Sequence, residues 1–308
     1  MRITPLAAES LGVRSMATFV EAAGTSILID PGASLAAARF GLPPADAEWE
    51  ALRRANDRIS AYAARADIVF VSHYHDDHFR SDPTSYAGHS VVARDPKRLA
   101  GAQARRGQAL WQALGDQARV SAAEGWTLRE RMLEVHASPP LPHGPDGTTL
   151  GTVVALTVVD VAERERFVFA SDVLGPLSPV ATAWIIHERP TLLYLSGPPT
   201  YLERTLGTPA IERAVDNLAR IIDKTGCRAI VDHHALRDPR GTARLERVWE
   251  TGRAMTAAGY VGVEATPWES QRAELWRAVR KPPTRVAAGG RAMMTRESRR
   301  VARGGSVK

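Results

Sequence analysis

Cysteine is nearly absent from this sequence: Cys227 is the only one in 308 residues. A single cysteine excludes an internal disulfide and argues against a thiolate metal cluster. We expect Cys227 to be a small buried hydrophobe beside a strand. Long apolar runs are missing as well. No stretch reaches about 18 apolar residues, so no membrane span is predicted, and the residues after Met1 lack the apolar core of a signal peptide. The expected compartment is the cytoplasm.

Most of the chain also lacks the positive charge that its net value of +6 suggests. Residues 280–308 hold nine Lys or Arg and one Glu, a net of +8, which leaves −2 for residues 1–279. This segment is rich in Pro, Gly and Arg, and we expect it to be mostly disordered. It is either a solvated tail without function or an electrostatic arm for RNA, DNA or an anionic surface. We predict one domain over 1–279, followed by this basic tail.

Hydrophobic patterning predicts strands and helices that alternate along the chain, which indicates the α/β class. Strands are predicted at 16–29 (a hairpin), 67–72, 90–93, 118–121, 126–128, 131–137, 151–160, 166–170, 191–195 and 228–232. Helices are predicted at 45–65, 97–118, 211–225, 242–258 and 268–279. The first helix is expected to bury Trp49, Leu52, Ile59 and Tyr62, and the second Trp111 and Leu114.

Three histidines and two aspartates lie within the six residues His73–His78, directly after the apolar run 67–71. Packing does not explain such a cluster, because buried polar side chains without partners cost several kcal/mol. Imidazole and carboxylate are ligands that zinc and its first-row neighbours accept, so we predict a metal site. Tyr74, between two of the histidines, is expected to face the opposite side of the sheet. Asp76 either hydrogen-bonds a ligand histidine or stays solvated.

Further candidate donors follow other predicted strands. His143 lies in a Pro/Gly loop, Asp172 follows the strand 166–170, and His233 with His234 follows the strand 228–232. Strand ends on one edge of a sheet converge in space, so residues distant in sequence can meet there. His136 competes with His143 as the third histidine ligand.

These motifs, in this order, resemble the metallo-β-lactamase superfamily over about residues 1–270. His73, His75, Asp77 and His78 match its His-x-His-x-Asp-His signature. An early aspartate, a third histidine, a bridging aspartate and a final histidine are matched by Asp30, His143, Asp172 and either His233 or His234. The local sequence of four segments resembles a subgroup of this superfamily that archaea and some bacteria share: 142–145, 170–176, 195–201 and 232–238. That subgroup has no settled substrate.

The resemblance implies a four-layer αββα sandwich with two divalent ions at one edge of its two sheets. One ion would be held by His73, His75 and His143, and the other by Asp77, His78 and His233 or His234. Asp172 would bridge both ions. Asp30 would orient the cluster by hydrogen bonds or would only form a turn before Pro31. Ser196 and Tyr201 follow the strand 191–195. They either line the substrate pocket or belong to a structural turn.

Two divalent ions a few ångströms apart imply hydrolysis by a bridging hydroxide, with Asp77 and Asp172 as the catalytic carboxylates. We expect zinc, although manganese, iron or nickel would also suit these donors. A phosphodiester or other phosphoester is the first-choice substrate, small or nucleotide-like, and a carboxylic ester, thioester or lactone is the alternative. A third alternative is a non-catalytic metal-dependent sensor or RNA-binding module. The sequence contains no indication of the oligomeric state.

Overall fold

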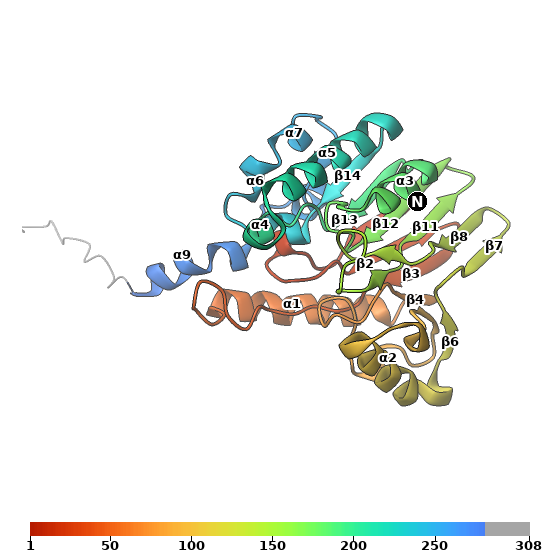
Figure 1. Cartoon of the computed structure of the whole chain (residues 1–308). Coiled ribbons are helices and arrows are strands. Elements are labelled where there is room, and N and C mark those ends of the chain that lie inside the picture. The colour runs from red at the N-terminus through yellow and green to blue at the C-terminus, as the bar shows by residue number, and fades with distance from the viewer. Residues whose placement is uncertain (281–308) are drawn as a thin grey trace, which may run out of the picture.

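The computed structural model describes residues 1–280 and shows two β-sheets packed face to face with helices on both outer sides (Figure 1). This arrangement confirms the α/β class and the expected four-layer αββα sandwich. The expected tail at 280–308 lies, apart from Arg280, outside the described residues. Within the described part of the chain, no helix is both long and apolar enough to cross a membrane.

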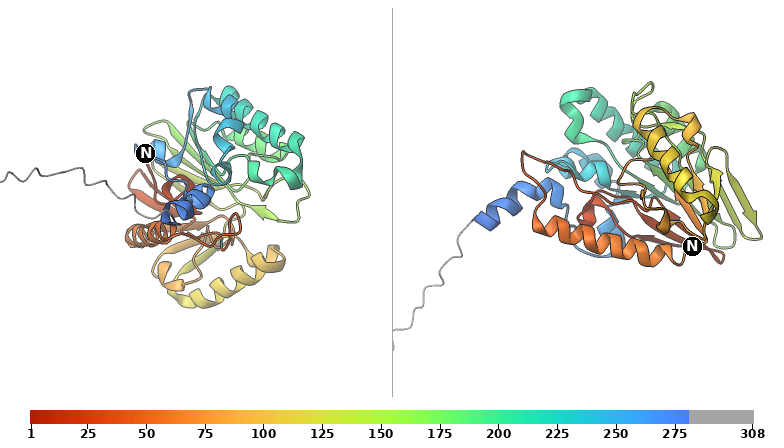
Figure 2. Two further views of the ribbon diagram at one scale, coloured as in Figure 1. Left: turned by 90° about the vertical axis from the view of Figure 1, so that its left-hand side faces the viewer. Right: turned by 90° about the horizontal axis from the view of Figure 1, so that it is seen from below.

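The first sheet has six strands in chain order: β1 (Arg2–Pro5), β2 (Thr18–Ala22), β3 (Thr25–Ile29), β4 (Ile68–Val71), β5 (Ser90–Ala93) and β6 (Arg119–Ala122). Strands β1, β2 and β3 pair antiparallel, whereas β3, β4, β5 and β6 pair parallel. Helices α1 (Asp46–Ala63) and α2 (Gly101–Leu114) cover its outer face and lie below the sheets in Figure 1 and in the left view of Figure 2. The parallel pairing brings the carboxyl ends of β3 and β4 to one edge.

The second sheet has seven strands. Its order is β15 (Ala254–Met255), β14 (Arg228–Val231), β13 (Leu192–Leu195), β12 (Glu165–Ser171), β11 (Leu156–Asp160), β8 (Leu133–Ala137) and β7 (Thr127–Glu130). Strands β12 to β15 are parallel. A separate two-stranded ribbon joins β9 (Leu141–Pro142) and β10 (Thr152–Val153). The remaining helices are α3 (Pro179–Glu188), α4 (Glu203–Leu206), α5 (Thr208–Thr225), α6 (Gly241–Arg244), α7 (Glu246–Trp249), α8 (Ala257–Val261) and α9 (Trp268–Arg280).

Side chains of the central strands alternate between two apolar layers. On β4, Phe70 packs between the sheets, and Val69 and Val71 pack toward α1 and α2. On β12, Phe167 and Phe169 likewise lie between the sheets. Strands buried on both faces read as continuous apolar runs, as these two do in the sequence. The core therefore fills both faces of β4, and the polar side chains that follow in the sequence lie beyond the end of this strand.

The predicted strands are confirmed within two or three residues, except that 151–160 is split into β10 and β11 and that the short strands β1, β9 and β15 were not predicted. The helix predicted at 242–258 is wrong: this segment forms α6 and α7, the strand β15 and the start of α8. Gly252 interrupts it at φ 63°, a conformation that favours glycine and ends a helix. Helix α3 was not predicted, although Ser178 caps its first turn.

The core predictions for α1 and α2 hold in part. Ile59 and Leu114 are fully buried, whereas Trp49 is 48% exposed, so its predicted burial is wrong. Trp111 is partly buried and donates from Nε1 to the Tyr74 hydroxyl at 2.8 Å. Cys227 is buried and free, as expected.

Candidate metal centre

Polar side chains converge where four parallel strands end. Asp30 follows β3 and His73 lies two residues after β4, both in the first sheet. Asp172 directly follows β12, and His233 comes two residues after β14, both in the second sheet. His143 follows β9. Because parallel strands end at a common edge, residues that are up to about 200 positions apart in sequence meet across the two sheets.

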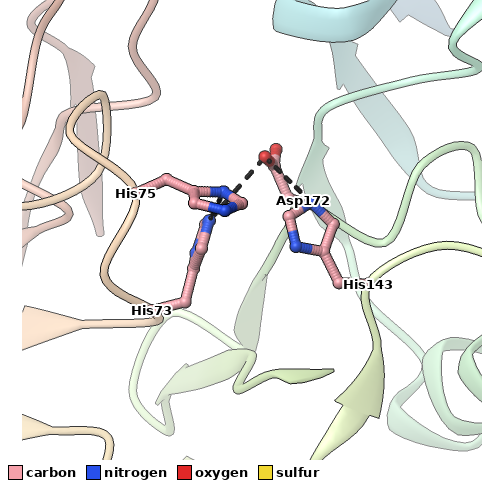
Figure 3. A group of neighbouring side chains, drawn as sticks. All are labelled: His73, His75, His143 and Asp172. Carbon is pink, nitrogen blue, oxygen red and sulfur yellow. Dashed lines mark hydrogen bonds and ion pairs between the residues drawn. The ribbon is translucent and has the colours of Figure 1, made fainter. Parts of the chain in front are cut away.

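Four of these residues form what we call the first donor group: His73, His75, His143 and Asp172. One nitrogen or oxygen from each lies within 4.8 Å of the others. Figure 3 shows His73 and His75, from the loop after β4, facing Asp172 and His143. The Oδ2 atom of Asp172 lies 3.8 Å from Nε2 of His73 and 3.5 Å from Nε2 of His143. His75 is partly exposed, and the other three are buried.

A second donor group consists of Asp77, His78 and His233, whose ligand atoms also lie within 4.8 Å of one another. His233 Nε2 lies 3.5 Å from Asp77 Oδ2 and 3.7 Å from Asp172 Oδ1. His78 Nε2 lies 3.3 Å from Asp172 Oδ2. Asp172 therefore contacts both donor groups, which is the position expected of a bridging carboxylate.

Asp30 orients the loop that carries both groups. Its Oδ2 atom accepts a hydrogen bond from Ser72 Oγ at 2.5 Å and lies 2.8 Å from His78 Nδ1, and its Oδ1 accepts from the Ser72 amide at 2.7 Å. Asp30 also makes a sharp turn at φ 47°, so the two expected roles coincide. Only glycine fits at position 32, because a Cβ there would lie 2.4 Å from the Phe79 amide nitrogen.

His233 and His234 both point into the centre but have different partners. Nδ1 of His233 lies 3.4 Å from a Glu9 carboxylate oxygen, a pairing that fixes the ring of a ligand histidine. His234 places Nε2 3.0 Å from Asp172 Oδ2 and Nδ1 2.6 Å from the Tyr201 hydroxyl. His233 is the one grouped with Asp77 and His78, whereas His234 groups with Asp172 and His233.

Burial dominates the protonation of the histidines. It lowers the pKa of His75 and of His234 to about 4, and the pKa of His73 and His233 also falls well below the usual value. These rings are therefore neutral near pH 7, as metal ligation requires. Burial opposes the charged form of His78 too, but the carboxylates of Asp172 and Asp30 outweigh it and raise the pKa of that ring.

A cavity of about 480 Å³ opens onto the first donor group. Its wall includes the donors His75, His143 and Asp172 together with Tyr201 and Leu174. Three arginines also line it: Arg14, Arg106 and Arg237. A larger hollow of about 1000 Å³ lies beside the β2–β3 turn and contains none of the donors, so the smaller cavity is the one placed to hold a substrate.

Of the other residues predicted for the site, only some line the cavity. Tyr201 lines this cavity, whereas Ser196 is fully buried and does not line it. His136 lies 2.8 Å from Glu188, away from the donors, so it does not compete with His143. Asp76 is exposed and ion-paired with Arg106 at 3.0 Å. Tyr74 faces away from the donors and donates to the Arg94 carbonyl.

Two ionisable residues at the second donor group were not predicted from the sequence. Glu9 is buried beside His233, and burial raises the pKa of its carboxyl to about 8 although Arg237 opposes that rise. Arg237 lies four residues after His233 and reaches Asp77 at 3.0 Å. Nothing in the sequence around Glu9 marks it. Arg237 stands inside the segment 232–238, where its spacing of one helical turn from His233 was a usable signal.

The sequence matches a known superfamily domain and a family of relatives. A family model described as a β-lactamase superfamily domain matches residues 13–153. A UPF0282 protein of Thermococcus onnurineus is 40% identical over 294 residues, covering 89% of this chain and 95% of that protein. A UPF0282 protein of Aeropyrum pernix is also 40% identical over 294 residues, covering 90% and 99%.

A solved structure has the same fold. It is a metal-dependent hydrolase of the β-lactamase superfamily and superposes with a TM-score of 0.51 at 14% sequence identity. The match covers 83% of this chain and 95% of that one. At this identity the likeness extends to the fold alone.

Proposed function

This chain belongs to the UPF0282 family of the β-lactamase superfamily, and from that membership we propose that it is a dinuclear metal-dependent hydrolase. The observation that carries the proposal is the meeting of two donor groups at Asp172, which contacts histidines of both. The first group combines three histidines with one carboxylate and the second combines two histidines with one carboxylate, and both are donor sets that divalent first-row metals accept.

Two buried atoms support the fit of metal ions to these residues. Within residues 1–280, His78 Nε2 and Asp172 Oδ1 have no hydrogen-bond partner although both are buried. A buried polar atom without a partner needs an explanation, and coordination to a cation provides one. Zinc is the default ion for histidine and carboxylate donors, and manganese, iron and nickel are also compatible.

The chain's own residues set the geometry of the proposed reaction. A divalent ion bound here would lower the pKa of a coordinated water to about 7 and polarise the bond to be cleaved. Asp30 holds the His78 ring by its Nδ1 atom, so the opposite nitrogen faces Asp172. Asp77 and Asp172 are the carboxylates that we assign to catalysis. Most of the donors are buried, and the lower dielectric around them strengthens their interactions with charge.

We favour a phosphodiester or other phosphoester as the substrate because of the arginines at the cavity. Arg106 is 37% exposed at the rim, and its partner Asp76 is 64% exposed. Ion pairs this exposed contribute only about 0–1 kcal/mol, so a phosphoryl group can replace Asp76 at little cost. A guanidinium binds a phosphate by two parallel hydrogen bonds, which makes Arg106 the natural anchor for such a group.

Metal analysis followed by a hydrolase panel tests the proposal. The purified full chain, loaded with Zn²⁺ or Mn²⁺, is assayed on bis-p-nitrophenyl phosphate, cyclic nucleotides, lactones and thioesters. We expect phosphodiester turnover that disappears in His75→Ala and persists in His187→Ala, a matched exposed histidine on α3. Turnover of lactones or thioesters alone would replace the substrate class. Bound metal without any turnover would favour the sensor alternative.

A further inference from the structure

The second donor group contains a cation of its own. The guanidinium Nη2 of Arg237 lies 3.0 Å from Asp77 Oδ2 and 2.8 Å from His233 Nε2. The same atom is 3.2 Å from His233 Nδ1, so it lies against the ring of His233 as a whole. Two of the three members of this group are thus already in contact with a positive charge.

Several neighbours hold the guanidinium in place. The Arg237 side chain is 5% exposed, and a charge so buried requires anionic partners. Asp77 supplies a carboxylate at 3.0 Å, and Glu9 Oε2 lies 3.5 Å from the Arg237 Nε atom. The Tyr201 ring lies 5.9 Å from the guanidinium carbon, within range of a cation–π contact. Arg237 and any metal ion in the second donor group would therefore compete for the Asp77 carboxylate.

The first donor group is different. Among residues 1–280, no lysine or arginine forms a hydrogen bond or ion pair with His73, His75, His143 or Asp172. A cation entering this group meets three imidazole rings and a carboxylate, without a guanidinium or ammonium in contact with them. In the second group it meets a guanidinium within hydrogen-bonding distance of two of its ligands, and like charges at such distances repel strongly when buried.

We propose that Arg237 makes the two donor groups bind metal unequally: the first group fills first and tightly, and the second fills only when the guanidinium leaves Asp77 and His233. This inference rests on the proposed function, since it assumes that the donors hold metal ions. Arg237 is thus a positioning residue that sets the metal stoichiometry at limiting metal. Because it also lines the cavity, a displaced guanidinium stays near the substrate.

Zinc binding to the metal-free full chain tests this directly. Zn²⁺ buffered over a range of free concentrations is equilibrated with the protein, and bound zinc per chain is measured by mass spectrometry. We expect two steps whose dissociation constants differ at least tenfold. Arg237→Gln keeps hydrogen-bonding capacity without the charge. In this variant the ratio of the two dissociation constants should fall at least tenfold. Arg240→Gln is the control, because that arginine is 74% exposed and pairs with Asp238; the zinc-binding steps of this variant should not change.

A second variant identifies the steps even if Arg237→Gln folds poorly. His233→Ala removes a donor of the second group and should abolish the weak step, leaving the tight step within about threefold of its original midpoint. Loss of the tight step instead would overturn the inference. Two equal steps in the unmodified chain would overturn it as well while leaving the proposed hydrolase intact. If the unmodified chain binds no zinc at all, the proposed function itself fails.

Discussion

The two sheets build their halves of the metal centre in different ways. The first sheet supplies His73, His75, Asp77 and His78 from one short loop, and a single carboxylate, Asp30, orients that loop. The second sheet supplies Asp172 and His233 from separate loops, and distant residues hold them. Asp232 accepts hydrogen bonds from the amides of Ser10 and His233, which places Glu9 beside the His233 ring. Local sequence determines the first half, whereas tertiary contacts determine the second.

Removing Asp172, the residue that contacts both donor groups, should have the largest effect. Asp172→Ala takes a carboxylate from both donor groups and leaves the surrounding histidines facing one another. We expect the loss of both zinc ions and a fall in hydrolysis of more than about a thousandfold, beyond the 10²–10³ typical of a single electrostatic contact. Metal content after dialysis and turnover of the best panel substrate measure this. Asp216→Ala, on an exposed surface pair with Arg247, is the control. Retention of two ions by Asp172→Ala would refute the bridging assignment.

The support of the first half is the next target. Asp30→Asn replaces an acceptor of four hydrogen bonds by a side chain with only one acceptor oxygen, so His78 and Ser72 lose their orientation. Because Ser72 Oγ also lies 2.9 Å from His73 Nδ1, both zinc steps should weaken, by roughly 10–100-fold. Asp67→Asn, on an exposed aspartate that accepts from Ser26, should change neither step. If only the weak step moved, Asp30 would act on His78 alone.

The support of the second half should matter less and act on one step only. Burial raises the pKa of the Glu9 carboxyl to about 8, so this test is run above that pH, where Glu9→Gln removes the charge beside His233 Nδ1 and leaves Asp77 as the remaining carboxylate for Arg237. The guanidinium is then drawn closer to the second donor group. In the same buffered titration, we expect the zinc affinity of the weak step to fall by up to about tenfold and that of the tight step to stay unchanged. A matching loss in the tight step would show that the two halves are not independent.

This contrast also explains what the sequence could predict. The four-residue signature at His73–His78 and the strand ends at Asp172 and His233 are visible because apolar runs stop there, and strand ends on one sheet edge converge. Glu9 could not be found, because its approach to His233 depends on hydrogen bonds made 222 residues apart in sequence, between Ser10 and Asp232. The predicted burial of Trp49 was wrong for a related reason: helical periodicity identifies an apolar face, but not where the neighbouring layer ends.

The helices at the carboxyl end illustrate the same limit. Residues 242–258 carry a helical composition, yet Ala254 and Met255 pair with β14 as the strand β15. Strand addition to a sheet edge is a tertiary gain that local propensity does not contain. Most strands of both sheets could therefore be predicted, whereas β1, β9, β15 and the supports of the second donor group could not.

The smallest expected effect concerns Tyr201, which distinguishes the cavity wall from the donors. Tyr201→Phe removes one hydroxyl that lies 2.6 Å from His234 Nδ1 and keeps the ring against Arg237. A lost neutral hydrogen bond costs about 1 kcal/mol, so turnover should fall by only about fivefold, without a change in either zinc step. Such a result would assign His234 to substrate positioning and leave His233 as the ligand of the second group. Loss of a zinc step in Tyr201→Phe would reverse that assignment, because it would mean that the ring fixed by Tyr201 is itself a ligand.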